Sequence, residues 1–122
     1  MILVDTSIWV RYFAGQEPFL SKTRKLLADG KVIAHELVYV EVLMGDQGSR
    51  TQFLEDYAEF PQAALLSNRE VLHFVRAHKL PGRGVGWIDV HLLASAVAGK
   101  LKLWTADPRF AAVAKELGVA YA

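Results

Sequence analysis

Four of the 13 acidic residues stand inside apolar segments or directly after them. Asp5 follows "MILV", Glu41 interrupts "VYVEVLM", Asp89 interrupts "GWIDVHLLASA" and Asp107 follows "LKLWTA". A carboxylate away from water is costly unless it is paired, hydrogen-bonded or bound to a cation. The settings of these four acids therefore suggest that each carboxylate has a partner, such as a hydrogen-bond donor or a bound cation.

Each of these acids also has an ordinary structural interpretation. Asp107 stands before a proline, which is a favourable N-cap arrangement. Asp89 falls in the first turn of a predicted helix, where a negative charge favours the helix dipole. Asp5 could cap a helix that follows it, and Glu41 could face solvent on a half-buried element. Taken singly, Asp107 and Asp89 favour the structural interpretation.

The hydrophobic pattern predicts short strands that alternate with helices, hence an α/β fold with a mostly parallel sheet. Segment 36–45 suits a strand as well as a buried helix, and we favour a helix because Glu36 falls in its first turn and Gly45 closes it. Segment 87–99 is apolar on nearly every face and predicts a central, enclosed helix. The predicted strands are 1–5, 31–35, 63–66, 101–106 and 119–122, and the predicted helices are 7–13, 18–29, 36–45, 49–60, 67–80, 87–99 and 107–118.

The predicted helix at 67–80 is amphipathic. Ser67 and Glu70 have the spacing of a capping box, in which each side chain binds the other's backbone N–H. Leu72, Phe74 and Val75 are expected on its inner side.

The predicted elements bring the acids toward one edge of the sheet. Asp5 and Asp107 both follow predicted strands, and the carboxyl ends of parallel strands form the crevice where ligands bind. Asp89 begins the central helix, whose first turn can face the same crevice. Carboxylates that converge repel one another unless a cation lies between them, and an all-oxygen set selects Mg²⁺ or Mn²⁺ over zinc.

Length and composition limit the classes of protein to consider. The 122 residues fit one domain, 1–122, with 52% hydrophobic and 22% charged residues, as in a globular protein. The absence of cysteine excludes disulfides and zinc–thiolate sites. The net charge of +1 gives no argument for binding nucleic acid. Any such argument must come from a particular site. No signal segment or membrane span is predicted, so we expect a cytoplasmic protein.

The segments "VDTSIWV", "VEVLMG", "GWIDVHLLASA" and "LWTADPRF" resemble, in this order and over the whole chain, the PIN domain, and more closely the VapC-type toxins of toxin–antitoxin pairs. This resemblance implies a three-layer PIN-like fold, with a short, mostly parallel central sheet flanked by helices. It also implies a metal-dependent endoribonuclease that uses Mg²⁺ or Mn²⁺, acts on RNA, is restrained by a cognate antitoxin protein and forms a homodimer.

The resemblance assigns roles to residues at matching positions. Asp5 and Asp89 would be direct metal ligands, and Glu41 and Asp107 would bind the metal directly or through water. Together these four would form the catalytic site. The positions that typically support it are matched by Thr6 or Ser7 and by Thr105.

Three arginines are candidate contacts for RNA phosphates. Arg83 lies in the glycine-rich segment "PGRGVG", where backbone can approach RNA, but a solvated arginine in a mobile loop is an equal alternative. Arg11 and Arg109 each follow an acidic motif closely and are weaker candidates of the same kind.

Aromatic residues give a further, less specific signal. Trp9, Trp87 and Trp104 could stack on bases, but all three lie in apolar runs, so core packing is favoured. His91 is two residues from Asp89, and a histidine inside an apolar helix is favoured as a satisfied core group.

Two other functions fit part of the pattern. A receiver-like phosphoacceptor module has similar length and element order, but it needs an acidic pair after the first strand and a lysine after a late strand. Here Thr6 follows Asp5, and no such lysine is found. A PIN-like interaction domain without catalysis is the second alternative, and the four intact acids argue against it.

Overall fold

A computed structural model describes residues 1–121, and its centre is a small parallel sheet. The sheet has the order β2-β1-β3, with β1 at Ile2–Val4, β2 at Val32–Ile33 and β3 at Lys102–Trp104. Both pairs of strands are parallel, as the sequence predicted. The central strand therefore pairs with one strand from the first third of the chain and one from the last.

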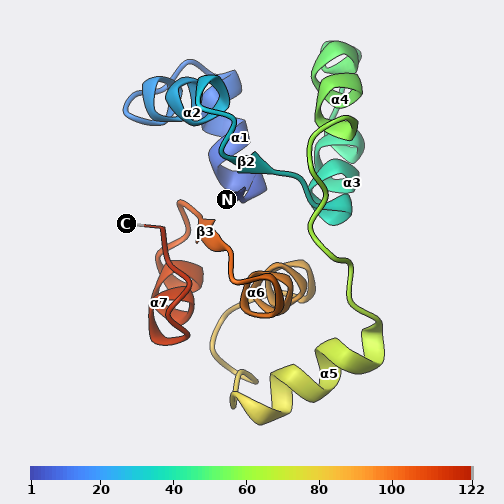
Figure 1. Ribbon diagram of the computed structural model, residues 1–122, viewed down its shortest axis with the longest axis vertical. Coiled ribbons are helices and arrows are strands. Elements are labelled where there is room, and N and C mark those ends of the chain that lie inside the picture. Colours follow the sequence, from blue (N-terminus) through green and yellow to red (C-terminus); the bar gives the residue numbers. More distant parts are fainter. Residues whose placement is uncertain (122) are drawn as a thin grey trace.

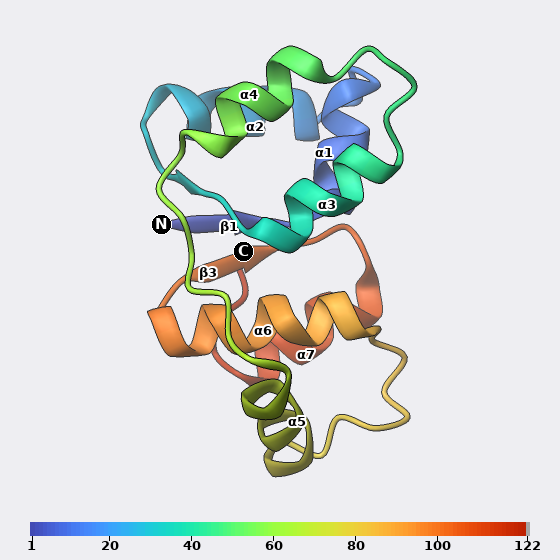
Figure 2. The same cartoon turned by 90° about the vertical axis from the view of Figure 1, so that its right-hand side faces the viewer.

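Helices cover both faces of this sheet. In Figures 1 and 2 the sheet lies between one group of helices formed by α1 to α4 and a second formed by α6 and α7, while α5 packs on the outer side of α6. This is the three-layer α/β arrangement. The helices are α1 (Thr6–Phe13), α2 (Phe19–Ala28), α3 (Glu36–Met44), α4 (Thr51–Ala58), α5 (Asn68–Ala77), α6 (Trp87–Gly99) and α7 (Pro108–Glu116).

Burial of β1 and α6 explains their unbroken apolar sequences. All three residues of β1 are buried, as expected for a parallel strand covered by helices on both faces. In α6, every residue from Val90 to Ala96 is buried, so the prediction of a central, enclosed helix is confirmed. Asp5 directly follows β1 and Asp89 lies in α6, so both acids are attached to buried elements of the core.

Local capping chemistry sets where two of the helices begin. Ser67 and Glu70 form the predicted capping box at the start of α5. Segment 36–45 is a helix, as favoured, and its N-cap is His35, whose Nδ1 accepts a hydrogen bond of 3.0 Å from the backbone N–H of Leu37. His35 is an unusual N-cap, because Ser, Thr, Asp and Asn are the residues most often found at this position.

The strand predicted at 63–66 is wrong. Residues 61–67 run in extended form past the edge of β2 toward α5 (Figure 2), with one isolated parallel bridge between Ala34 and Gln62. The backbone N–H of Ala63 still donates to the carbonyl of Ala34 at 2.7 Å. Pairing ends there, so the segment is a connection and not a strand of the sheet.

Two further predictions need correction. The strand predicted at 119–122 is reduced to one parallel bridge, between Leu103 and Ala120, and Ala122 lies outside the described residues. Leu72 does not face inward: it is 46% exposed, whereas its neighbour Val71 is buried. Among residues 1–121, no helix combines the length and the apolar character needed to cross a membrane.

Candidate metal centre

Asp5 lies at the carboxyl end of β1 and is buried. Its backbone N–H donates to the carbonyl of Trp104 at 2.9 Å, which keeps β1 and β3 paired up to this point. Its Oδ2 accepts hydrogen bonds from the hydroxyls of Ser7, at 2.7 Å, and Thr105, at 2.9 Å. Asp5 stands at the N-cap position of α1, but its side chain accepts no capping hydrogen bond, so helix capping does not explain the carboxylate.

The same two hydroxyls tie the loop after β3 to the start of α1. The oxygen of Ser7 accepts from the backbone N–H of Ala106 at 3.0 Å. The oxygen of Thr105 accepts from the backbone N–H of Asp107 at 3.1 Å. Ser7 and Thr105 therefore orient the carboxylate of Asp5 and fix the backbone that leads into Asp107.

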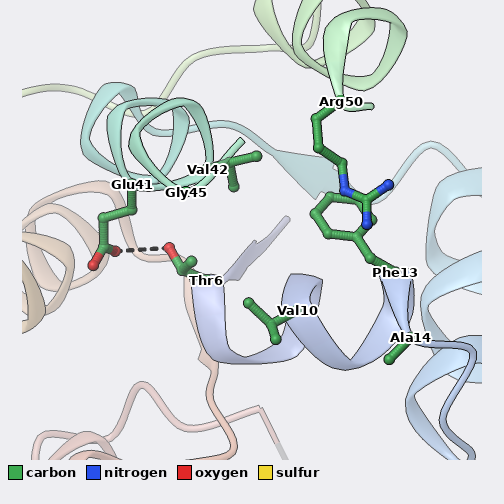
Figure 3. Close-up of a pocket in the computed structure, with 8 residues that line it drawn as sticks. All are labelled: Thr6, Val10, Phe13, Ala14, Glu41, Val42, Gly45 and Arg50. Carbon is green, nitrogen blue, oxygen red and sulfur yellow. Dashed lines mark hydrogen bonds between the residues drawn. The ribbon is translucent and has the colours of Figure 1, made fainter. Parts of the chain in front are cut away.

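Glu41 projects from α3 toward the start of α1. Its Oε1 accepts a hydrogen bond of 2.7 Å from the hydroxyl of Thr6 (Figure 3). Partial burial raises the pKa of Glu41 above its usual value, the hydrogen bond from Thr6 opposes this shift, and the negative charges of Asp5 and Asp89 add to it. Glu41 therefore lies in the electrostatic field of the other acids.

Asp89 lies in the first turn of α6 and reaches back to the residue before it. Its Oδ2 accepts a hydrogen bond of 2.9 Å from the backbone N–H of Gly86, the N-cap residue. Partial burial raises the pKa of Asp89, the bond from Gly86 opposes this shift, and the charges of Asp5 and Asp107 add to it. The carboxylate thus serves the helix start and also lies near two other acids.

Asp107 is the N-cap of α7, with Pro108 in the first turn. Its Oδ1 accepts from the backbone N–H groups of Arg109, at 2.9 Å, and Phe110, at 3.4 Å. The capping interpretation of Asp107 is confirmed. Capping uses Oδ1 of Asp107, and Oδ2 accepts no hydrogen bond from residues 1–121.

The four acids share a pattern of hydrogen bonding. In each, one oxygen is bound by a hydroxyl or a backbone N–H, and the second accepts no hydrogen bond from residues 1–121. Within that range the ion pairs are Lys25 with Asp29 and Arg83 with Glu116, and neither involves these acids. Neighbouring carboxylates without a cationic partner and with free oxygens suit a hard cation such as Mg²⁺ or Mn²⁺.

The arrangement is an open one. Within residues 1–121, no three Asp, Glu or His side chains are grouped closely enough to enclose a metal ion. The four carboxylates therefore affect one another electrostatically without forming a closed set of ligands. Their carboxylate oxygens are nevertheless the donor type that a hard divalent cation prefers.

The three candidate arginines have different surroundings. The guanidinium of Arg83 lies 2.8 Å from the carboxylate of Glu116, and its side chain is exposed, so it is a solvated arginine that also forms an ion pair. Arg11 donates to the carbonyl of Ser7 at 2.8 Å. The side chain of Arg109 lies against the loop, because a Cβ added at Gly84 would be 2.7 Å from its Cδ. Their role as phosphate contacts stays a prediction.

The tryptophans divide into two groups. Trp9 and Trp104 are buried, which confirms core packing for both. Trp87 is 44% exposed, so core packing was the wrong prediction for this residue. It begins α6, where the apolar sequence runs past the end of the core. His91 is buried, as expected, with its Nε2 3.3 Å from Oδ1 of Asn68, but its Nδ1 has no hydrogen-bond partner among residues 1–121, so it is not the fully satisfied core group that was predicted.

A hollow that the sequence did not predict lies beside Glu41, with a volume of about 300 Å³. Thr6, Glu41 and apolar side chains of α1 and α3 line it (Figure 3). The guanidinium of Arg50 lies at its rim, 4.1 Å from the centre of the Phe13 ring. No local pattern could have shown this, because Arg50 lies far from α1 in the sequence.

Comparison with known proteins agrees with this geometry. The PIN domain family matches residues 2–116. The chain is 37% identical over 123 aligned residues to proteins named Ribonuclease VapC32 from two strains of Mycobacterium tuberculosis, CDC 1551 / Oshkosh and ATCC 25618 / H37Rv, covering 100% of this chain and 97% of each relative. The chain therefore belongs to the PIN domain family and is of the VapC type.

Proposed function

We propose that this chain is a metal-dependent endoribonuclease that hydrolyses RNA phosphodiester bonds at Asp5, Glu41, Asp89 and Asp107 and acts as the toxin of a toxin–antitoxin pair. One observation carries the proposal: neighbouring carboxylates each keep a free oxygen and have no cationic partner within residues 1–121. The full-length similarity to a ribonuclease supports the same reaction. As the family resemblance predicts, we place the activity in the cytoplasm, in one PIN-like domain over residues 1–122 that forms a homodimer.

Different residues of the chain would bind the metal and orient its ligands. Mg²⁺ or Mn²⁺, when bound, supplies an activated water and stabilises the charge that grows on the phosphate. Asp5 and Asp89 would be the direct ligands. Glu41 and Asp107 would bind directly or through water. The donors to these carboxylates, which are Thr6, Ser7, Thr105 and the backbone of Gly86, would hold the ligand oxygens in place.

Cleavage of a single-stranded RNA, with and without metal, tests the proposal. We expect cleavage in Mg²⁺ or Mn²⁺ and none in excess chelator. Asp5→Asn and Asp89→Asn should abolish cleavage while circular dichroism shows an intact fold. Glu55→Gln is the matched control, because Glu55 is an exposed acid on α4.

Three outcomes would contradict the proposal. Cleavage at full rate in chelator, in a preparation free of other nucleases, would remove the metal requirement. Full activity in both Asp variants would return these acids to a structural role. No cleavage by the unsubstituted chain under any metal would favour the alternative of a catalytically silent PIN-like domain. The family match leaves no support for a receiver domain.

The hollow beside Glu41 is where we propose that the antitoxin binds. Val10 on its wall is 56% exposed, and Leu43 and Met44, elsewhere on α3, are also exposed, so an amphipathic segment could bury apolar surface here. A basic side chain of that segment would reach Glu41. A bound antitoxin would then block the acids without any broad charge attraction.

Inhibition by the cognate antitoxin tests this placement. Val10→Asp should weaken binding of the antitoxin and leave RNA cleavage in its absence unchanged. Lys25→Gln, on the exposed side of α2, should change neither. A complex that inhibits cleavage while all four carboxylates stay open to solvent would contradict it.

A further inference from the structure

A second hollow lies between α5, the loop 81–86 and the start of α6, with a volume of about 240 Å³. We propose that it is a subsite for one nucleoside of a single-stranded RNA, next to the phosphate held at the acids. This inference rests on the proposed function and adds to it the surface that holds the strand beside the scissile bond.

The lining of this hollow suits a flat aromatic base. Its walls are chiefly apolar, formed by Leu72, Val75, Leu80, Val85, Trp87 and Val90. Leu72 and Trp87 are 46% and 44% exposed, so the hollow opens to solvent between two large apolar side chains. Concave apolar sites of this kind bind planar organic groups.

Trp87 gives the hollow a stacking surface. Its ring packs against the ring of His91 at 90°, with the centroids 4.7 Å apart, so the indole is supported while part of it stays exposed. Bases stack on such side chains in many proteins that bind single strands, whatever the base. Trp9 and Trp104, by contrast, are buried and can offer no such surface.

Gly86 joins this hollow to the acids. It lines the hollow, and its backbone N–H donates the 2.9 Å hydrogen bond to Asp89. The loop is also fastened to α7, through the ion pair of Arg83 with Glu116 and the packing of Gly84 against Arg109. A base in the hollow would therefore lie beside Asp89 on a wall that is fixed in place.

Basic residues near the hollow support RNA as the occupant. Although the whole chain has a net charge of only +1, residues 67–83 contain four basic residues and one acid. All four are exposed, but Arg69 lines a different hollow and Arg83 pairs with Glu116, so the relevant cations are Arg76 and Lys79, each next in sequence to a lining residue. Arg76 follows Leu72 by four positions, which places both on one face of α5. An apolar hollow with Arg76 and Lys79 beside its lining suits a strand whose bases stack and whose phosphates are negative.

The test measures binding and not cleavage. In the Asp5→Asn background, which should not cleave, the affinity for a fluorescently labelled single-stranded RNA of mixed sequence is measured across a range of salt concentrations. Trp87→Ala should weaken binding about tenfold, and Trp87→Tyr should restore most of it, because stacking needs an aromatic face. Arg76→Gln should weaken binding and reduce its dependence on salt. Lys22→Gln, an exposed lysine on α2, is the matched control and should change neither.

Unchanged RNA affinity in both Trp87→Ala and Arg76→Gln would overturn the inference. If these variants instead lose self-association, the hollow is a contact between protein chains, and the inference is also overturned. Failure of the nuclease proposal is distinguishable, because the unsubstituted chain would then not cleave RNA. RNA binding that depends on Trp87 in such a protein would still support the subsite.

Discussion

The hydroxyl of Thr105 donates a hydrogen bond of 2.9 Å to the carboxylate of Asp5, 100 positions away in the sequence. The same hydroxyl accepts from the backbone N–H of Asp107 at 3.1 Å. One small side chain therefore touches two of the four candidate acids. It joins the ends of β1 and β3 at the point where we propose that the metal binds.

Replacement of Thr105 tests this link. Thr105→Val keeps the shape of the side chain and removes the donor to a buried carboxylate, which should cost about 1–3 kcal/mol of unfolding free energy. Cleavage should fall as well, because Asp5 loses one of its two orienting hydroxyls. Thr105→Ser keeps the hydroxyl and should retain most of the activity. Equal activity in the Val and Ser variants would mean that the hydroxyl does not position Asp5.

Asp107 allows its two roles to be separated. Asn caps a helix about as well as Asp, so Asp107→Asn should leave unfolding free energy within a few tenths of a kcal/mol, whereas Asp107→Ala should lose about 1 kcal/mol. If the free Oδ2 of Asp107 serves the metal, cleavage should fall in both variants. Denaturant unfolding and RNA cleavage, measured side by side, distinguish the cases. Full activity of Asp107→Asn would show that Asp107 caps α7 and does not bind the metal.

His35 makes the stability of the fold depend on pH. Complete burial, with a smaller contribution from the nearby His91, lowers the pKa of His35 to about 4. Nδ1 accepts from the N–H of Leu37, so Nε2 carries the proton and donates to the hydroxyl of Ser95 at 3.0 Å. The hydroxyl of Tyr57 also faces this site and accepts from the backbone N–H of His35. The folded state thus favours neutral His35.

The sign of the effect follows from these two states. Below a pH of about 6.5 the unfolded chain binds a proton at His35 that the folded chain does not, so stability falls as the pH drops toward 4. A shift of this size corresponds to about 3 kcal/mol over that range. His35→Asn keeps a capping side chain without titration, and its unfolding free energy should fall less steeply between these pH values. Parallel curves for the two proteins would contradict the assignment.

Gly84 tests the candidate role of Arg109. Gly84 has φ of +80°, and a Cβ there would displace the Arg109 side chain. Gly118 has φ of +73° with open space around it, so Gly118→Ala is the matched control for backbone strain. Both substitutions should cost about 1–2 kcal/mol of unfolding free energy. Only Gly84→Ala should lower RNA cleavage, to the level of Arg109→Ala. Equal cleavage by the two glycine variants would remove Arg109 from the proposed RNA contacts.

Much of the fold could be predicted because its signals are local. Capping at Ser67 and Asp107 and the apolar run of α6 each depend on a few neighbouring residues, and the order of helices followed from them. The placement of Asp5 and Asp107 near one edge of the sheet needed one further rule, that parallel strands end on the same side. The confirmed parallel sheet allowed that rule to apply.

The features that the sequence did not show depend on distant partners. Segment 63–66 has a strand-like composition, but a strand needs a ladder, and the sheet offers this segment a single bridge. Arg83 finds Glu116 33 positions away, and no local pattern shows that pair. Trp87 belongs to an apolar run, yet its exposure depends on where α6 emerges from the core. Tertiary placement, and not residue type, decided all three.

The central position of β1 has a consequence for synthesis of the chain. Its partner β3 follows much later in the sequence, so 100 positions must be synthesised after Asp5 before Thr105 can reach it. Closing so long a loop also costs entropy before any contact repays it. Nascent chains that stop before residue 107 would therefore carry no complete set of acids. Under the proposed function, cleavage by a ribosome-bound chain is therefore expected only after Asp107 has emerged.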